Sequence, residues 1–112
     1  MAEQPVSLAK WIIAVRDARS EYFNPKLFDE DSWELLLTLY IAAEEGRTVN
    51  RAEVMQHTVT SAATLDRWIK ILASEDLLTE PADDDETLCL TRNGHTRMHN
   101  LLAKTVPTPP GA

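Results

Sequence analysis

Two helical patterns separated by a very short turn constrain the fold more than any other feature of the chain. A capping signal, Asn50-x-x-Glu53, precedes a short helix that we expect to end at about His57. Four turn-prone residues follow, and the last of them, Ser61, can cap a longer helix. Two capped helices joined by so short a connection outline a helix-turn-helix, which we therefore predict over residues 50–74.

Two further helices are predicted before this motif. The first covers residues 7–22, where Ser7 can act as the N-cap. The second begins with capping-box chemistry at Asp31-x-x-Glu34, and Gly46 follows its last turn in the place of a left-handed C-cap. Because apolar residues cover several sides of this second helix, we expect it to be central in the fold.

The segment after the motif predicts a small hairpin and a last helix. Strand-like alternation on both sides of an acidic turn predicts a β-hairpin over residues 77–91, and Thr91 can cap a helix over residues 92–104. The expected fold class is therefore mainly α with a small β-hairpin (α+β). The expected organisation is a flexible leader (1–6), a single domain (7–104) and a flexible, proline-rich tail (105–112).

Length, charge and cysteine content exclude several classes of protein. The 112 residues suffice for one domain with a hydrophobic core, and the net charge of −7 is unlike that of a strongly basic nucleic-acid-binding domain. The single cysteine, Cys89, excludes an intramolecular disulfide framework and fits a reducing compartment. No apolar run approaches the ~18 residues of a membrane span, and the N-terminus lacks the pattern of a signal peptide. We therefore expect a soluble, cytoplasmic protein of bacterial type that does not contact a membrane.

A series of motifs resembles one family of regulators. The helix pattern Leu65-x-x-Trp68-Ile69-x-x-Leu72 leads through a short polar hairpin to Leu90-Thr91-Arg92-Asn93-Gly94. This order resembles the recognition helix, the wing and the last helix start of MarR-like winged helix-turn-helix transcriptional regulators, and it extends over residues 28–102. The run from Tyr22 to Phe28 resembles a compact bacterial subgroup of them. The resemblance implies a winged helix-turn-helix with added N-terminal and C-terminal helices. It also implies a homodimer that places one recognition helix per half-site of double-stranded DNA in the major groove.

A helical wheel separates an apolar face of the second motif helix from a face that can meet DNA. The apolar side carries Leu65, Trp68, Ile69 and Leu72, and the opposite side carries Ala63, Arg67 and Lys70. Small residues permit close approach to base edges, and an arginine can bind guanine bidentately. Asp66, beside this face, can accept from a cytosine amine or repel DNA. The candidate DNA-binding residues are Arg51, Ser61, Ala63, Thr64, Arg67 and Lys70, of which Arg51 and Lys70 suit phosphates. The alternative is that these cations are ordinary solvated charge.

The first and last helices are the candidate dimer interface, because an unpaired apolar stripe needs a partner surface. The stripe residues are Leu8, Trp11, Ile12 and Val15 in the first helix, and Met98, Leu101 and Leu102 in the last. The alternative is that the first helix folds back onto its own domain.

Charge along the chain supports two different functions. Residues 47–74 carry four basic and two acidic residues, so the helix-turn-helix is locally positive within a negative protein. The turn of the hairpin, in contrast, carries Asp83, Asp84, Asp85 and Glu86, which would repel phosphates. We therefore expect a sequence-specific DNA-binding transcriptional regulator. The alternative is a winged-helix protein–protein interaction module with an acidic wing and little or no DNA binding.

Other chemistries have weak signals. The acidic turn lacks the alternating ligands and glycine of a calcium loop. His95 and His99 have a spacing compatible with metal binding, but Cys89 would supply only a third ligand, whereas structural zinc usually has four. No cation neighbours Cys89 to stabilise a thiolate, so we expect packing rather than redox sensing. Neither a nucleophile triad nor a phosphate-binding loop is present. We therefore expect no metal, no cofactor and no enzymatic activity.

Overall fold

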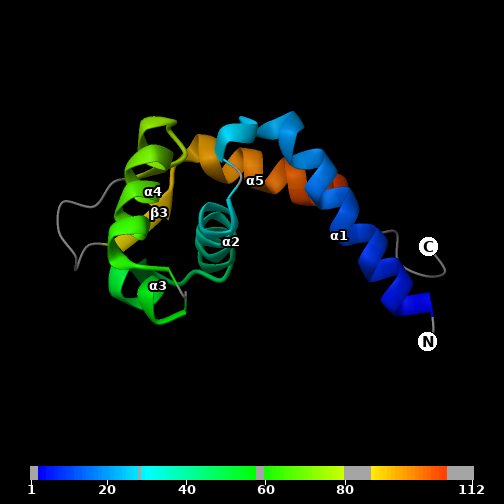
Figure 1. Cartoon of the computed structure of the whole chain (residues 1–112), viewed down its shortest axis with the longest axis horizontal. Helices are drawn as coiled ribbons and strands as arrows, with labels where there is room; N and C mark the ends of the chain where they lie inside the picture. The colour runs from blue at the N-terminus through cyan, green and yellow to red at the C-terminus, as the bar shows by residue number, and fades with distance from the viewer. Residues whose placement is uncertain (1–2, 28, 58–59, 80–86, 106–112) are drawn as a thin grey trace.

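Helices form most of the protein and lie around a small antiparallel sheet (Figure 1). The computed structural model describes residues 3–27, 29–57, 60–79 and 87–105. The predicted fold class, mainly α with a small β-hairpin, is confirmed. In chain order the elements are α1 (Glu3–Tyr22), the 3-10 helix η1 (Pro25–Leu27), α2 (Glu30–Glu44), β1 (Val49–Asn50), α3 (Arg51–His57), α4 (Ala62–Ser74), β2 (Leu78–Thr79), β3 (Thr87–Leu90) and α5 (Arg92–Thr105).

The sheet has the order β1-β3-β2, and β3 pairs antiparallel with both neighbours. β2 and β3 form the predicted hairpin, in which Leu78 lies opposite Leu90. β1 is not predicted by the sequence, because two residues are too few to show the alternation of a strand. This short strand ends where α3 begins, so it ties the start of the helix pair to the sheet. The acidic residues of the predicted turn lie outside the described residues.

The predicted N-caps of α3 and α4 are present. The side chain of Asn50 accepts a hydrogen bond from the backbone N–H of Glu53 at 2.9 Å, and Ser61 accepts from the N–H of Thr64 at 3.1 Å. After the C-terminal end of α2, the predicted C-cap glycine, Gly46, has a φ of 68°, which is the left-handed conformation expected at this position. Local side-chain chemistry therefore sets the ends of the helix pair.

The start of α2 differs from the prediction by two residues. Its N-cap is Asp29, not Asp31, and Asp29 has the extended backbone of a cap (φ −124°, ψ 155°). The Asp29 side chain accepts from the N–H of Asp31 at 2.9 Å. Ser32 completes the capping box in place of Glu34, because its hydroxyl accepts from the N–H of Asp29 at 3.1 Å.

The first helix is longer than predicted. α1 begins at Glu3, so residues 3–6, which the sequence predicts as part of a flexible leader, are helical. Pro5 is compatible with this start, because the N–H groups of the first turn have no acceptor within the helix. α1 packs along α5, and its N-terminal half extends away from the other elements at the end of the molecule opposite α4 (Figure 1). The molecule is therefore elongated, with extents of 48 × 26 × 25 Å.

The core lies between α2, α4, α5 and the sheet. α2 is central, as predicted, and its Leu35, Leu36 and Leu39 are buried. From α4 come three further buried side chains: Leu65, Ile69 and Leu72. Trp68, which the sequence places on the same apolar face, is only half-buried and lies outside the core cluster. The buried face of α4 is thus narrower than predicted.

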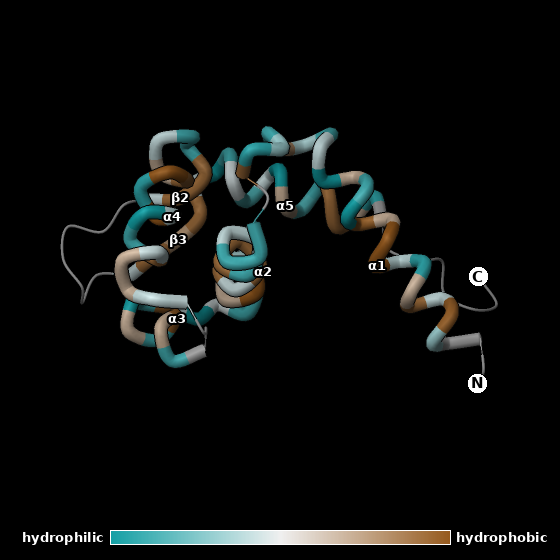
Figure 2. Tube along the Cα trace, in the orientation of Figure 1, coloured by the Kyte–Doolittle hydropathy of each residue, from teal (hydrophilic) through white to brown (hydrophobic). Residues whose placement is uncertain are grey.

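The predicted dimer residues divide into two groups. Met98 and Leu101 of α5 are 0% exposed, and Val15 of α1 is also buried. The place of Met98 and Leu101 in a dimer interface is therefore corrected, because these two side chains belong to the core of one protomer. Leu8 and Ile12 are instead 53% and 57% exposed, as are Val6 and Ile13 to similar extents. Figure 2 shows hydrophobic residues along the extended part of α1. Within the described ranges, no helix combines the length and the apolar character needed to cross a membrane.

Candidate nucleic-acid interface

The outer face of α4 is the first candidate interface. Ala63, Arg67 and Lys70 are exposed on the side opposite the buried leucines and isoleucine of this helix. In Figure 1, α4 runs along the edge of the molecule that is farthest from α1. Neither the Arg67 side chain nor the Lys70 side chain has a hydrogen bond or an ion pair within the part of the chain that the structure describes. The face is therefore open, and both of its cations can meet a ligand.

Ser61 and Thr64 shape the first turn of α4. The Ser61 hydroxyl accepts from the backbone N–H of Thr64 and donates to Thr64 Oγ1 at 3.0 Å. Thr64 is half-buried and lies at one side of the exposed face, whereas Ala62 and Ala63 are exposed. The sequence places Ser61 and Thr64 among the candidate DNA-binding residues. In the structure their hydroxyls pair with each other, so the small side chains of the two alanines form the open part of this turn.

Arg51 does not lie with the other cations. It is the first residue of α3, and its Nε donates to Asp66 Oδ1 on α4 at 2.6 Å. Its Nη2 lies 3.5 Å from the carbonyl oxygen of Ala62. The Arg51 side chain is only 17% exposed. The sequence predicts a phosphate contact for Arg51, but the structure directs its guanidinium toward α4, where it neutralises Asp66.

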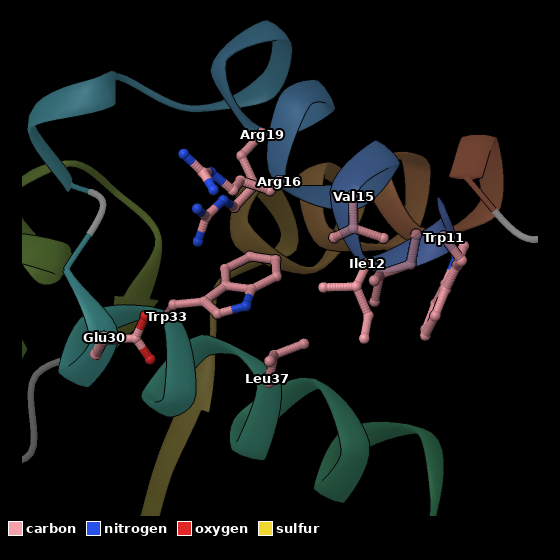
Figure 3. A pocket seen from close by; sticks show the side chains of 9 residues that line it. Trp11, Ile12, Val15, Arg16, Arg19, Glu30, Trp33 and Leu37 are labelled. Atoms are coloured by element: carbon pink, nitrogen blue, oxygen red, sulfur yellow. The ribbon is translucent and has the colours of Figure 1, made fainter. Parts of the chain in front are cut away.

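A groove between α1 and α2 is a second candidate site (Figure 3). The cavity has a volume of about 330 Å³ and opens to solvent. The guanidinium carbon of Arg19 lies 5.0 Å from the centre of the Trp33 ring, an arrangement typical of a cation–π contact. Four of the predicted dimer residues (Trp11, Ile12, Val15 and Leu102) line this groove rather than a flat helix face. The complete lining is Trp11, Ile12, Val15, Arg16, Arg19, Glu30, Trp33, Leu37 and Leu102.

The two histidines of α5 contact α2. His95 Nε2 lies 3.0 Å from Glu44 Oε1, and His99 Nδ1 lies 2.9 Å from the hydroxyl of Tyr40. Burial, followed by the neighbouring Glu44 carboxylate, raises the pKa of Tyr40 above its ordinary value. Cys89 is exposed on β3, and its thiol hydrogen-bonds to the hydroxyl of Thr79 rather than to either imidazole. Among the described residues, no three His, Cys, Asp or Glu side chains are placed to hold a metal ion.

No family model, curated protein or solved structure matches the chain. The residues that sequence reasoning misses are those whose partners are distant in the chain. The pairing of Arg51 with Asp66 and the alignment of Glu44 with His95 depend on how the helices pack, and no local motif signals either contact. The outer face of α4, in contrast, follows directly from helical periodicity.

Proposed function

We propose that the protein is a sequence-specific, double-stranded DNA-binding transcriptional regulator that acts as a homodimer through a winged helix-turn-helix. The observation that carries the proposal is the open outer face of α4, on which Arg67 and Lys70 are exposed and without partners among the described residues. Supporting it, α3 ends at His57 and α4 begins at Ala62, and a hairpin follows α4. This is the order of elements in a winged helix-turn-helix.

The proposed contacts follow from the chemistry of the exposed side chains. The major groove of B-DNA is about 12 Å wide and admits an α-helix. Ala63 lets the backbone of α4 approach the base edges, and the Arg67 guanidinium is suited to the two acceptors of guanine. Each such bidentate pair provides about 1–3 kcal/mol of discrimination against the wrong base. Lys70 presents a point charge to a phosphate, which orients the helix without reading sequence.

Dimerisation is proposed through α1 and the groove beside it. The exposed apolar side chains of α1 are Val6, Leu8, Ile12 and Ile13, and the groove adds Trp11 and Leu102. A two-fold symmetric contact uses the same patch on both subunits, so α1 of one copy can pack against α1 of the other. Because α1 extends at the opposite end of the molecule from α4, a contact there leaves both α4 faces open. A symmetric dimer would read two half-sites whose centres are one helical turn of DNA, about 34–36 Å, or a multiple of it apart.

Binding to labelled duplexes over a range of salt concentrations tests this function. Selection from random duplex DNA should yield a palindromic consensus. Arg67→Ala should relax the base preference at one position of each half-site, whereas Lys70→Ala should weaken binding to all duplexes and reduce the salt dependence by about one ion. Lys26→Ala is the matched control, because this exposed lysine lies in η1, away from α4, and should leave affinity unchanged.

The result that contradicts the proposal is an absence of duplex binding even at low salt. Non-specific binding of any protein with such a face is strongest at low ionic strength, so a true DNA-binding protein must bind there. Recovery of a specific protein partner in the same preparation would then support the interaction-module alternative. Bound and unbound states are separable by fluorescence anisotropy of the labelled DNA.

A further inference from the structure

One ion pair connects the two helices of the helix-turn-helix. Arg51 begins α3, immediately after β1, and Asp66 lies in the second turn of α4. Their side chains meet at 2.6 Å, with Arg51 17% exposed and Asp66 50% exposed. The long contact from Arg51 Nη2 to the Ala62 carbonyl reaches the first turn of the same helix. Arg51 therefore spans the angle between α3 and α4 at the end where α4 begins.

Asp66 has one possible cationic partner on α4 itself. Lys70 is four residues later, which places the two side chains on adjacent turns of one helix face. Arg67 follows Asp66 directly and is exposed on the same half of the helix. Were Asp66 unpaired, its carboxylate could attract Lys70 and would stand beside the incoming phosphates with a repulsive charge. In the structure it is Arg51, from the other helix, that holds this carboxylate.

We infer that Arg51 is a positioning residue of the DNA interface, which holds Asp66 toward α3 and thereby keeps Lys70 available beside Arg67 on the outer face of α4. The inference rests on the proposed function and corrects the role that the sequence assigns to Arg51. A phosphate ligand must reach outward, but this guanidinium is mostly buried and directed at a protein carboxylate. Its effect on DNA is exerted through Asp66.

A second-site rescue distinguishes this role from a phosphate contact. Arg51→Met keeps the length of the side chain and uncovers Asp66, so duplex affinity should fall. Removal of one effective charge at about 0.1 M salt corresponds to a loss of roughly tenfold. Adding Asp66→Asn removes the uncovered carboxylate, so the double variant should regain the affinity and the salt dependence of the unmodified protein. If Arg51 contacts phosphate, the double variant instead remains weak, with a salt dependence lower by about one ion, and the inference is overturned.

Arg51→Lys provides a second comparison if Arg51→Met does not fold. Lysine retains a cation that can meet a phosphate, but it lacks the planar fork through which Arg51 holds Asp66 and approaches Ala62. A positioning role therefore predicts that Arg51→Lys loses affinity and that Asp66→Asn restores it. Unchanged affinity in Arg51→Lys would contradict the positioning role. Far-UV circular dichroism verifies that each variant is folded before affinity is compared.

A measurement without DNA separates this inference from the proposed function. In a double-mutant cycle of urea unfolding, Arg51 and Asp66 should show a coupling that the exposed pair Arg47 and Glu45 does not. The control pair is also an arginine–carboxylate contact, at 2.7 Å, but both of its side chains are more than half exposed. Absence of duplex binding with intact coupling would refute the function and retain the link between α3 and α4. A coupling no larger than that of the control would refute the positioning role itself.

Discussion

Replacing Gly94 with alanine should destabilise the protein, although the same change within most helices is stabilising. Gly94 lies in the first turn of α5, and its N–H donates to the Thr91 hydroxyl at 3.0 Å. A Cβ atom at this position would lie 2.0 Å from the carbonyl oxygen of Leu77 and 2.9 Å from its carbonyl carbon. Both are backbone atoms, so rotation of a side chain cannot relieve the overlap.

The magnitude follows from the movement that alanine requires. An ordinary contact needs about 3.4 Å, so α5 and Leu77 must separate by more than 1 Å. The hydrogen bond from the Thr91 N–H to the Leu77 carbonyl, now 3.1 Å, would be broken or weakened, at a cost of about 1–3 kcal/mol. Displacing α5, whose Met98 is fully buried, adds about 1–3 kcal/mol of packing strain. The better helix propensity of alanine offsets about 1 kcal/mol, which leaves a net loss of about 3 kcal/mol.

Urea unfolding followed by circular dichroism measures this change, and Gly46→Ala is the matched control. Gly46 has a φ of +68°, but a Cβ atom there would have no neighbour within 4 Å. Its replacement should therefore lower the unfolding free energy only by the cost of holding alanine in the left-handed conformation, about 1–2 kcal/mol. Gly94→Ala should therefore unfold at a lower urea concentration than Gly46→Ala. Equal or greater stability of Gly94→Ala relative to the unmodified protein would show that α5 does not approach Leu77 this closely.

Three other perturbations test separate parts of the structure. Ser61→Ala removes the N-cap of α4 and should lower the unfolding free energy by about 1 kcal/mol, measured in urea. In the folded state, burial and the neighbouring Glu44 raise the pKa of Tyr40 above 10.0 and so favour the neutral phenol. The unfolding free energy should therefore fall as the pH rises above that value. Tyr40→Phe should remove this part of the decline when unfolding is measured over a series of alkaline pH values. Ile13→Asp should convert a dimer to a monomer in sedimentation experiments without unfolding it, because this side chain is 58% exposed in the protomer. A dimer that persists in Ile13→Asp would place the interface elsewhere.

The sequence predicts the helix pair well because its signals are local. The caps at Asn50 and Ser61 each involve a backbone group only three residues away, so the pattern contains both partners. The start of α2 is harder, because Asp29 and Asp31 are both good caps. Ser32 decides between them: its hydroxyl donates to the carbonyl of Leu27, a partner in the preceding η1 that capping patterns do not include.

The apolar stripe of α5 shows what periodicity cannot decide. Met98 and Leu101 have the spacing of a buried helix face, and that spacing is the same whether the covering surface belongs to the same chain or to a second copy. In the structure the cover includes α1, more than seventy residues earlier in the chain. This packing leaves Leu8 and Ile12 exposed, so the part of the predicted dimer surface that remains exposed lies mainly on α1.

Spatial pairing also changes the meaning of the charge count over residues 47–74. Along the chain, Arg47, Arg51, Arg67 and Lys70 count equally as cations that could attract DNA. In space, Arg47 pairs with Glu45 and Arg51 pairs with Asp66, so these arginines largely neutralise nearby carboxylates. The remaining two cations lie on one exposed face of α4, opposite its buried side chains. A protein with a net charge of −7 can therefore present a positive surface, because orientation rather than total charge decides which groups a phosphate would meet.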